Sequence, residues 1–339
     1  MFNVLVDAYG GDNAPLEIVK GAIEALGRRK DLQVTLVGYE DKLREVLTSL
    51  KYTDDRISII NANDVISNED SPTDAIRKKK DSSLVVAYDE FKDSDKYCGL
   101  LSAGPTGAVL TGAVLKVGRI KGVSRPALIP NLPTAKGGLV TICDGGSNVD
   151  CSVQQLEHFA LMGNAYLKTC YGVKNPRVAL LNIGTESTKG NELTKEMYAK
   201  LSEMPGINFV GNMEAREVLS GDYDLIVADG FAGNVALKST EGAAYTVLKL
   251  LKKEIKASFL AKIGYLFMKP SFKRLKKVMD YSEHGGCLFI GCKKIVVKAH
   301  GSSNSTIIRN AVLQVVQFAE AGIIEELHAI FNNNEEAQA

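Results

Sequence analysis

The chain has 339 residues, of which 45% are hydrophobic and 24% charged, and its formal net charge is +1. This length allows one large α/β domain or two modest ones, and the small net charge gives no global field that would indicate nucleic-acid binding. No apolar stretch approaches the ~18 residues of a membrane-spanning helix, and the first residues lack the basic region and long apolar run of a signal peptide.

Short apolar runs alternate with longer amphipathic stretches, the pattern of βα units around a mostly parallel sheet. The predicted strands are Asn3–Val6, Gln33–Val37, Ile57–Ile60, Gly99–Ser102, Leu139–Cys143, Val178–Ile183, Asn208–Val210, Asp224–Val227 and Ile295–Lys298. The predicted helices are Leu16–Leu26, Asp41–Leu50, Ser82–Phe91, Ala108–Val117, Ser152–Leu167, Glu192–Leu201, Asn234–Ile255 and Ser303–Ala321. Because several strands are apolar throughout, we expect helices on both faces of the sheet. The prediction is one α/β domain over residues 1–322, followed by a polar tail at 323–339.

Polar loops follow the predicted strands. They read DAYGGDNAP (7–15), SAGPTGA (102–108), CDGGSNVDC (143–151), NIGTESTKGNEL (182–193), VGNMEAR (210–216), ADGFAGNVALK (228–238) and KAHGSSNST (298–306). The carboxyl ends of strands in an open α/β sheet face the ligand crevice, so we expect these loops to share one pocket.

The loops carry groups that bind anions. Their glycines let a ligand approach the backbone, and helices that begin just beyond them offer unpaired N–H groups to phosphate or carboxylate. We therefore predict a site for a small phosphorylated or phosphate-like ligand. The predicted substrate-binding residues are Asp7, Gly10, Gly11, Asp12, Asn13, Gly104, Thr106, Gly107, Asn148, Asn191, Asp229, Asn234, Lys298, Ser302 and Ser303.

Simpler roles stay open for several of these residues. Asp7, Asp12 and Asp229 can serve as helix caps, and His300 can have a structural role at a helix start. Cys151 is interpreted as a buried structural thiol rather than a nucleophile, since no His lies near it in sequence. The six cysteines form no C-x-x-C pair and are expected to be reduced, and neither they nor the histidines have zinc-site spacing, so no metal is predicted.

Common enzyme signatures are missing. No G-x-G-x-x-G follows the first strand, and neither a G-x-x-x-x-G-K-[ST] loop nor a G-x-S-x-G elbow occurs. These absences disfavour a dinucleotide-binding enzyme of the common type, a P-loop NTPase and a serine hydrolase.

A basic segment lies between Lys249 and Lys277. It holds ten Lys or Arg residues and one Glu, so its net charge is 10 − 1 = +9. Ile255, Phe259 and Ile263 recur at helical spacing, and Pro270 interrupts the run. We predict a basic amphipathic helical hairpin at about 249–280, which suits an anionic membrane surface. A dimer-packing helix pair and a docking site for an acidic carrier protein are the alternatives.

Taken in order, these motifs resemble the PlsX family of bacterial phosphate acyltransferases. The resemblance runs from about Val4 to Ala321. It rests on VDAYGGDNAP, AIRKKKDSSLVVA, SAGPTGA, RPALIPNLPT, GGSNVDC, LLNIGTESTKGNEL, FVGNMEAR, DGFAGNVALKSTEG and KAHGSSN. The chain departs from the family pattern at Tyr9, where Met is usual, at Pro105, where Asn is usual, and in DGGSN, where DVGAN is usual. Pro105 lacks both an amide side chain and a backbone donor.

The resemblance implies an isopropylmalate-dehydrogenase-like fold, a homodimer and no cofactor. It also implies transfer of a long-chain acyl group from acyl-[acyl-carrier protein] to inorganic phosphate. The acyl phosphate would then feed a membrane glycerol-3-phosphate acyltransferase of the PlsY type in phospholipid synthesis. The expected location is cytoplasmic, with peripheral membrane attachment.

The expected mechanism needs no protein nucleophile, because phosphate itself attacks the thioester. The predicted catalytic residues are Lys189, which would hold phosphate, Asn212, which would stabilise the oxyanion, and His300, which would protonate the departing thiolate or bind phosphate. Two alternatives remain: a phosphotransacetylase-like enzyme that uses acyl-coenzyme A, and a non-catalytic membrane-associated scaffold that binds the carrier protein. An oxidoreductase of the isopropylmalate type is disfavoured, because no suitable pair of metal-binding aspartates follows a strand.

Overall fold

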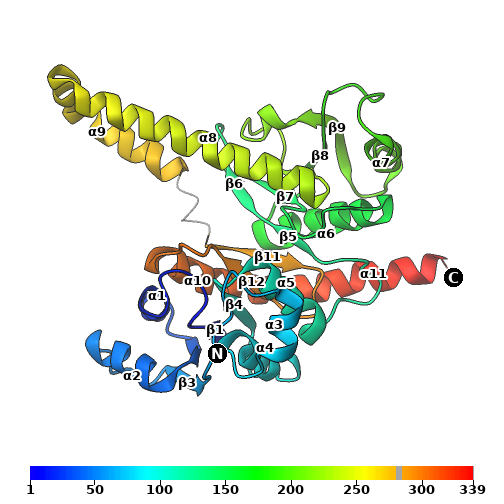
Figure 1. Ribbon diagram of the computed structural model, residues 1–339. Helices are drawn as coiled ribbons and strands as arrows, with labels where there is room; N and C mark the ends of the chain where they lie inside the picture. Colours follow the sequence, from blue (N-terminus) through cyan, green and yellow to red (C-terminus); the bar gives the residue numbers. More distant parts are fainter. Residues whose placement is uncertain (280–284, 339) are drawn as a thin grey trace. The chain divides into compact units, whose positions relative to one another are not determined.

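The computed structural model describes residues 1–279 and 285–338 (Figure 1). They divide into two compact units, each with its own sheet. Unit 1 contains Met1–Pro130, Leu161–Lys174 and residues 285–338, and unit 2 contains Asn131–Ala160 and residues 175–279. The helix α6 (Val153–Tyr171) contributes residues to both. The prediction of a single domain did not anticipate this division.

Unit 1 is built on a seven-stranded sheet with the order β3-β2-β1-β4-β12-β11-β5. In it β1 is parallel to both β2 and β4, whereas β11 is antiparallel to both of its neighbours. The strands are β1 (Phe2–Asp7), β2 (Leu32–Gly38), β3 (Ile57–Asn61), β4 (Gly99–Ser102), β5 (Ala127–Ile129), β11 (Gly286–Ile290) and β12 (Val296–Ala299).

Helices cover both faces of this sheet, as the apolar strands require. Successive residues of β4 point to opposite faces. Leu100 packs in the buried cluster that contains Tyr88 of α4, whereas a Cβ at Gly99 would lie 2.5 Å from Val315 of α10. The helical elements of unit 1 are α1 (Leu16–Leu26), α2 (Glu40–Ser49), α3 (Pro72–Lys78), α4 (Ser83–Lys92), α5 (Thr106–Gly112), the π-helical turn η1 (Ala113–Val117), α10 (Ser305–Ala321) and α11 (Ile323–Gln338).

Unit 2 has a five-stranded sheet with the order β6-β7-β10-β8-β9. Its central strand β10 is parallel to β7 and β8, and the edge strand β6 is antiparallel to β7. The elements are β6 (Asn131–Pro133), β7 (Leu139–Cys143), β8 (Arg177–Asn182), α7 (Glu192–Glu203), β9 (Asn208–Glu214), the 3-10 turn η2 (Ala215–Glu217), β10 (Leu225–Val227), α8 (Gly230–Ala257) and α9 (Phe259–Met279).

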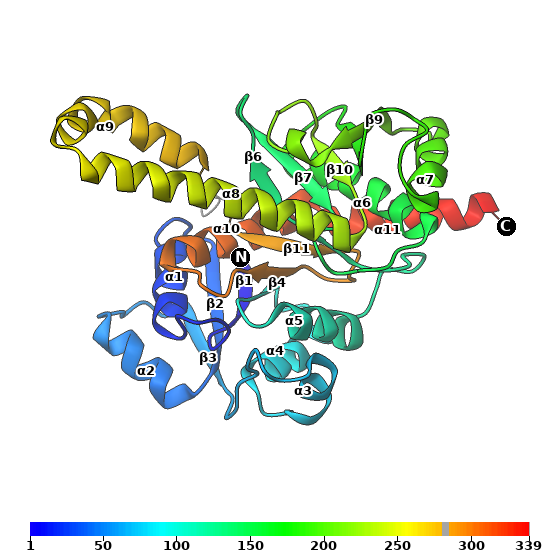
Figure 2. The same ribbon diagram turned by 45° about the horizontal axis from the view of Figure 1, so that its top comes forward.

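The basic segment forms a helical hairpin in unit 2. The helix α8 ends at Ser258, and α9 turns back beside it, as both Figure 1 and Figure 2 show. The hairpin is therefore as predicted, but the break is not at Pro270, which lies inside α9. Proline removes one backbone hydrogen bond, here the one to the carbonyl of Leu266, and this exposed helix continues despite that loss.

The α/β class with mostly parallel sheets is confirmed, and every predicted strand and helix has a counterpart. The strands β5, β6 and β11 and the helices α3 and α11 were not predicted. Four of these elements, β5, β6, β11 and α3, are only three to seven residues long, so their sequences carry little periodicity.

The predicted polar tail at 323–339 is wrong for its first part. The helix α11 begins at Ile323, and Ile323, Leu327 and Phe331 are at most 2% exposed. Their spacing of four places all three side chains on one helical face, which the polar residues around them obscured.

Among the described residues, no single helix is long and apolar enough to cross a membrane. Two consecutive helical segments, Ser305–Ala321 and Ile323–Asn332, are together long and apolar enough to cross a membrane, by length and composition only, and they are bent by 47° relative to each other.

The packing of α11 can be tested by truncating its last buried side chain. Phe331→Ala should lower the free energy of unfolding by about 3–5 kcal/mol, since it removes a buried aromatic ring. Asn332→Ala, at an exposed neighbour, should change it by less than about 0.5 kcal/mol. Urea denaturation measures both, and equal small effects would show that α11 is not part of the folded core.

Candidate functional site

Three loops meet in unit 1 at backbone distances that only glycine permits. A Cβ at Gly10 would lie 2.6 Å from the backbone nitrogen of Gly104. Gly11 has φ of +94°, and a Cβ there would lie 2.8 Å from the carbonyl oxygen of Gly301. The predicted grouping of 7–15, 102–108 and 298–306 is thus present in this unit.

A buried carboxylate joins the first two loops. Ser102 Oγ donates to Asp7 Oδ2 at 2.7 Å, and the Gly104 N–H donates to Ser102 Oγ at 3.0 Å. Asp7 is 2% exposed, and burial raises the pKa of its carboxyl above the ordinary value, against the opposing effect of its hydrogen bonds to Ser83 and Ser102. Asp7 therefore holds the loops in place instead of presenting a charge to solvent.

The loop after β12 carries the polar groups of unit 1. Lys298 is 8% exposed, and its ammonium donates to the carbonyl of Ala299. Ser303 is 1% exposed, and its Oγ has no hydrogen-bond partner among the described residues. His300 is exposed, and its Nδ1 accepts the Ser302 N–H at 3.2 Å, so the neutral ring carries its proton on Nε2.

The remaining unit 1 candidates are exposed. Asn13 Nδ2 donates to the carbonyls of Ser302 and Ser303 at 3.1 and 3.2 Å, and the Asp12 N–H donates to Gly301 at 2.8 Å. These bonds tie the turn at 12–13 to the 300–303 loop. Thr106 and Gly107 lie exposed in the first turn of α5.

The first turn of α10 is already occupied by side chains. Glu17 Oε2 accepts the Ser305 N–H at 2.6 Å, and Asn304 Oδ1 accepts the Ile307 N–H at 3.1 Å. The predicted anion binding at this helix start therefore competes with a carboxylate of the protein.

In unit 2, Asp144 organises the loop after β7. Its carboxylate accepts the N–H groups of Gly146, Ser147 and Asn148 and the side-chain amide of Asn148, at 2.7 to 3.0 Å. A Cβ at Gly146 would lie 3.2 Å from Cγ of Asn234, so the loop packs against the first turn of α8.

The start of α8 is fixed at the same place. Asp229 Oδ1 accepts the Ala232 N–H at 2.8 Å and caps the helix, and the Gly230 N–H donates to the carbonyl of Asn148 at 2.7 Å. A Cβ at Gly233 would lie 2.0 Å from the Asp144 carbonyl oxygen. The structure thus brings Asn148, Asp229 and Asn234 together, and gives Asp229 the capping role left open above.

The loop from Ile183 to Asn191 carries Lys189, which is exposed. Asn212 of β9 is 4% exposed, and its Nδ2 donates to the carbonyl of Glu186 in this loop at 2.9 Å, while its Oδ1 has no hydrogen-bond partner among the described residues. Asn191 Oδ1 accepts the Thr194 N–H at 2.9 Å and caps α7. Asn212 therefore supports the loop that presents Lys189, a contact that the sequence did not indicate.

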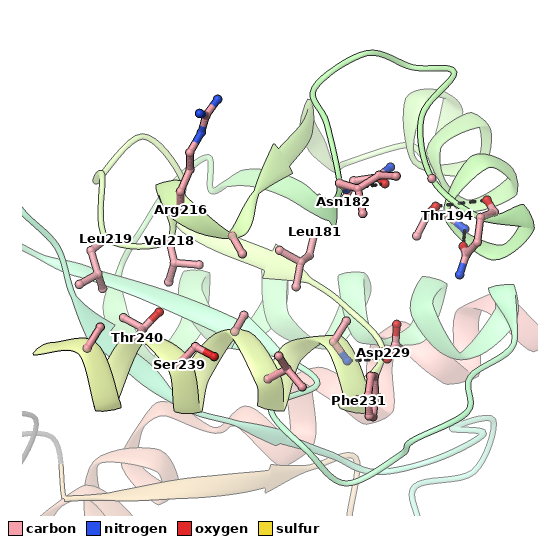
Figure 3. A pocket seen from close by; sticks show the side chains of 18 of the residues that line it. Leu181, Asn182, Thr194, Arg216, Val218, Leu219, Asp229, Phe231, Ser239 and Thr240 are labelled. Carbon is pink, nitrogen blue, oxygen red and sulfur yellow. Dashed lines mark hydrogen bonds between the residues drawn. The ribbon is translucent and has the colours of Figure 1, made fainter. Parts of the chain in front are cut away.

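A pocket of about 1150 Å³ lies in unit 2 between α8 and the strands (Figure 3). Two predicted residues, Asn191 and Asp229, line it together with Asn182, Gly190 and Thr194. The rest of the lining is mostly small or apolar: Leu181, Ile183, Ala215, Arg216, Val218, Leu219, Phe231, Ala232, Val235, Ala236, Ser239, Thr240, Ala243, Ala244 and Val247.

Sequence reasoning missed Asp144 and the pocket wall on α8. The glycine pair that follows Asp144 drew attention to the loop but not to the carboxylate that shapes it. On α8, small and apolar residues recur every three or four positions from Ala232 to Val247, and that stripe was a usable signal.

The cysteine thiols do not form a reactive centre. Burial raises the pKa of Cys151 to about 11, so at neutral pH this group is a thiol and not a thiolate. No disulfide joins the six cysteines, all of which lie in the described ranges. Within those ranges no group of three His, Cys, Asp or Glu side chains is placed to hold a metal.

The chain shares its fold with phosphotransacetylases of known structure. The chain superposes on a phosphotransacetylase, EutD, from Staphylococcus aureus with a TM-score of 0.58 at 16% identity, over 94% of each chain. A phosphotransacetylase from Streptococcus pyogenes gives 0.56 at 17% identity, again over 94% of each. At these identities the likeness shows the fold alone.

Sequence comparison identifies the family. The sequence model of the protein family described as "Fatty acid synthesis protein" matches residues 2–326. The phosphate acyltransferase of Clostridium perfringens (strain ATCC 13124) is 49% identical over 96% of this chain and 95% of its own length, and that of Clostridium tetani is 46% identical over 96% of each. The chain belongs to this family, which the sequence motifs had indicated, and it is an acyltransferase that acts on phosphate.

The buried Asp7 predicts a specific pH dependence of stability. Because its folded pKa is raised above 3.8, its contribution to the free energy of unfolding is present below that pH and is lost as the pH rises through the folded pKa. The stability of the wild type should therefore fall relative to that of Asp7→Asn as the pH rises from 3.8 through the folded pKa.

The opposite sign is expected at Asp31, whose pKa is lowered by its hydrogen bond to Arg29. The free energy of unfolding of the wild type should exceed that of Asp31→Asn at neutral pH, and this difference should shrink as the pH falls through the folded pKa of Asp31. Urea titrations at several pH values measure both variants, and parallel pH profiles for Asp7→Asn and the wild type would contradict the assignment.

Proposed function

We propose that the acyl donor is a long-chain acyl-[acyl-carrier protein] and that the acyl phosphate formed serves phospholipid synthesis. The family description as a fatty acid synthesis protein and the large, mostly apolar pocket of unit 2 support a long-chain donor. The observation that carries the phosphate-binding part of the proposal is the grouping, in unit 1, of glycine backbone, a buried ammonium and a buried hydroxyl that has no hydrogen-bond partner among the described residues.

The unit 1 loops are suited to hold the phosphate. Lys298 supplies a positive charge, Ser303 Oγ is a buried hydroxyl without a hydrogen-bond partner among the described residues, and Gly11 lets its loop pack directly against Gly301. Charge-assisted and backbone donors of this kind are the usual ligands of phosphate oxygens. Asp7 serves this site indirectly, by fixing the loops from within.

In the proposed reaction, a phosphate oxygen attacks the thioester carbonyl carbon, and the carrier-protein thiolate leaves with a proton. Holding phosphate beside the thioester contributes through proximity, up to ~7–11 kcal/mol in ideal cases. Lys189 is proposed to stabilise negative charge, and Asn212 to stabilise the oxyanion or position the Lys189 loop. His300 is proposed to bind phosphate or, as an imidazolium, to give the departing thiolate its proton. The raised pKa of Cys151 argues against a thioester on the enzyme.

Coenzyme A thioesters are the second candidate donors, because the fold is shared with phosphotransacetylases. Incubating the protein with phosphate and a long-chain acyl-carrier thioester, then trapping acyl phosphate with hydroxylamine, tests the proposal directly. The proposal expects product from the carrier thioester at a higher kcat/KM than from the matching acyl-coenzyme A. The reverse order would favour the phosphotransacetylase-like reaction.

In the same assay, Lys189→Ala should lower kcat/KM by about 10²-fold, the effect of removing one group that stabilises the transition state. Lys195→Ala, at an exposed lysine of α7, is the matched control and should retain activity. Cys151→Ser should also retain it. Full activity in both Lys189→Ala and Asn212→Ala would exclude the proposed catalytic pair.

The hairpin is proposed to attach the protein to an anionic membrane surface, with the chain acting as a cytoplasmic homodimer that supplies a membrane acyltransferase of the PlsY type. Phe259, Leu260 and Phe267 are 76%, 78% and 83% exposed near the turn of the hairpin, on helices that also carry lysines. Exposed apolar side chains with basic neighbours are the features that bind amphipathic helices to anionic lipid.

Liposome flotation tests this attachment. Phe259→Glu and Phe267→Glu should each reduce binding to anionic vesicles by at least ~10-fold, because each replaces a ring whose burial is worth about 1.5–3 kcal/mol. Val210→Glu, at a side chain on β9 that is 44% exposed, is the control and should float like the wild type. Wild-type binding that does not depend on anionic lipid would exclude the idea.

A further inference from the structure

One face of α8 forms a continuous wall of the unit 2 pocket. The lining residues of this helix recur every three or four positions, as one helical stripe requires: Ala232, Val235, Ala236, Ser239, Thr240, Ala243, Ala244 and Val247. Leu181 of β8 and Val218 and Leu219 after η2 form part of the opposite wall (Figure 3). The space exists because the α8 stripe consists mainly of small side chains.

The two ends of the pocket carry different side chains. Asn182, Thr194 and Asp229 lie together at the end where α8 begins, whereas Leu219, Thr240 and Arg216 lie toward the other end (Figure 3). Beyond Thr240 the α8 stripe continues through Ala243 and Ala244 to Val247.

Only two of the lining residues are charged, and both have partners. Asp229 accepts from the backbone of Ala232, and Arg216 forms an ion pair with Glu214. An apolar ligand would therefore not leave either charge buried and unpaired.

The dimensions of the pocket suit an extended hydrocarbon chain. From Asp229 to Val247 the helix rises by about 27 Å. One acyl chain spans roughly half of a ~30 Å bilayer core, or about 15 Å. The volume of about 1150 Å³ is slightly above the usual range of small-molecule sites, ~300–1,000 Å³.

We propose that this pocket binds the acyl chain of the substrate, with the carbonyl end at the start of α8 and the tail directed toward Val247. In this arrangement a chain of about 15 Å extends about ten residues along α8, to about Ser239, and the side chains at 243 and 244, which lean back toward the start of the helix, limit longer chains. The inference rests on the proposed function for the identity of the donor, but the placement of the chain stands on the lining and length of the pocket.

Filling the distal end of the pocket should change the chain-length preference without abolishing catalysis. Ala244→Phe should lower kcat/KM for a sixteen-carbon donor relative to an eight-carbon donor by about fourfold for each methylene displaced, hence by more than ~10-fold for two. Thr246→Phe introduces the same ring on α8 at an exposed position outside the pocket and should leave the ratio unchanged. Equal losses for both donors, or an unchanged ratio in both variants, would overturn the proposal.

A binding measurement separates this inference from the proposed function. The chain contains no tryptophan, so Ala244→Trp and Thr246→Trp each carry a single tryptophan, whose emission can be excited separately from that of tyrosine. A bromine-labelled long-chain fatty acid should quench the tryptophan emission of Ala244→Trp and leave that of Thr246→Trp nearly unchanged. Thermal unfolding of both variants checks that they are folded.

The outcomes are distinct. Selective quenching together with no acyl phosphate from any donor would reject the proposed function and retain the chain site. Acyl phosphate formation without selective quenching would reject the chain site and retain the function. Emission of Ala244→Trp that shifts to shorter wavelength with protein concentration, without quenching, would show that a second copy of the chain covers the pocket and would also overturn the proposal.

Discussion

The hydrogen bond between Ser102 and the buried Asp7 carboxylate links the ends of β1 and β4. A carboxyl group in this position is stable only when its oxygens have donors. Two of those donors, Ser102 Oγ and the Tyr9 N–H, belong to the glycine loops, and Ser83 of α4 is a third. Satisfying this one buried group therefore helps to hold two loop backbones close together, at the approach of Gly10 to Gly104.

In unit 2, a carboxylate likewise holds a loop that follows a strand. Asp144 turns the loop after β7 back upon itself, and the loop packs over the first turn of α8, where Gly230 and Gly233 leave no room for a side chain. The direction of α8 is thereby fixed where it leaves the sheet. Everything that α8 carries, from the pocket wall to the hairpin, depends on this start.

Much of the fold and part of the candidate site could be predicted from the sequence. Long helices and buried strands have strong periodicity, and the polar loops could be placed at strand ends because parallel strands share a direction. Short edge strands such as β5 and β6 leave no such pattern, and the turn at Ser258 was assigned to Pro270 because proline is the stronger local signal. Asp144 and Asn212 act through contacts with distant backbone, which no local pattern reveals.

The pocket wall on α8 has a consequence for how the protein can change. The volume of the pocket is large because Ala243, Ala244 and their neighbours on α8 have small side chains. The other face of this helix is exposed to solvent. Adding a methyl group on the pocket side fills space without disturbing a packed core, and removing one opens no new cavity inside the sheet. The shape of this pocket is thus almost uncoupled from the stability of the fold, and single substitutions can reshape it while the loops that shape the rest of the site stay as they are.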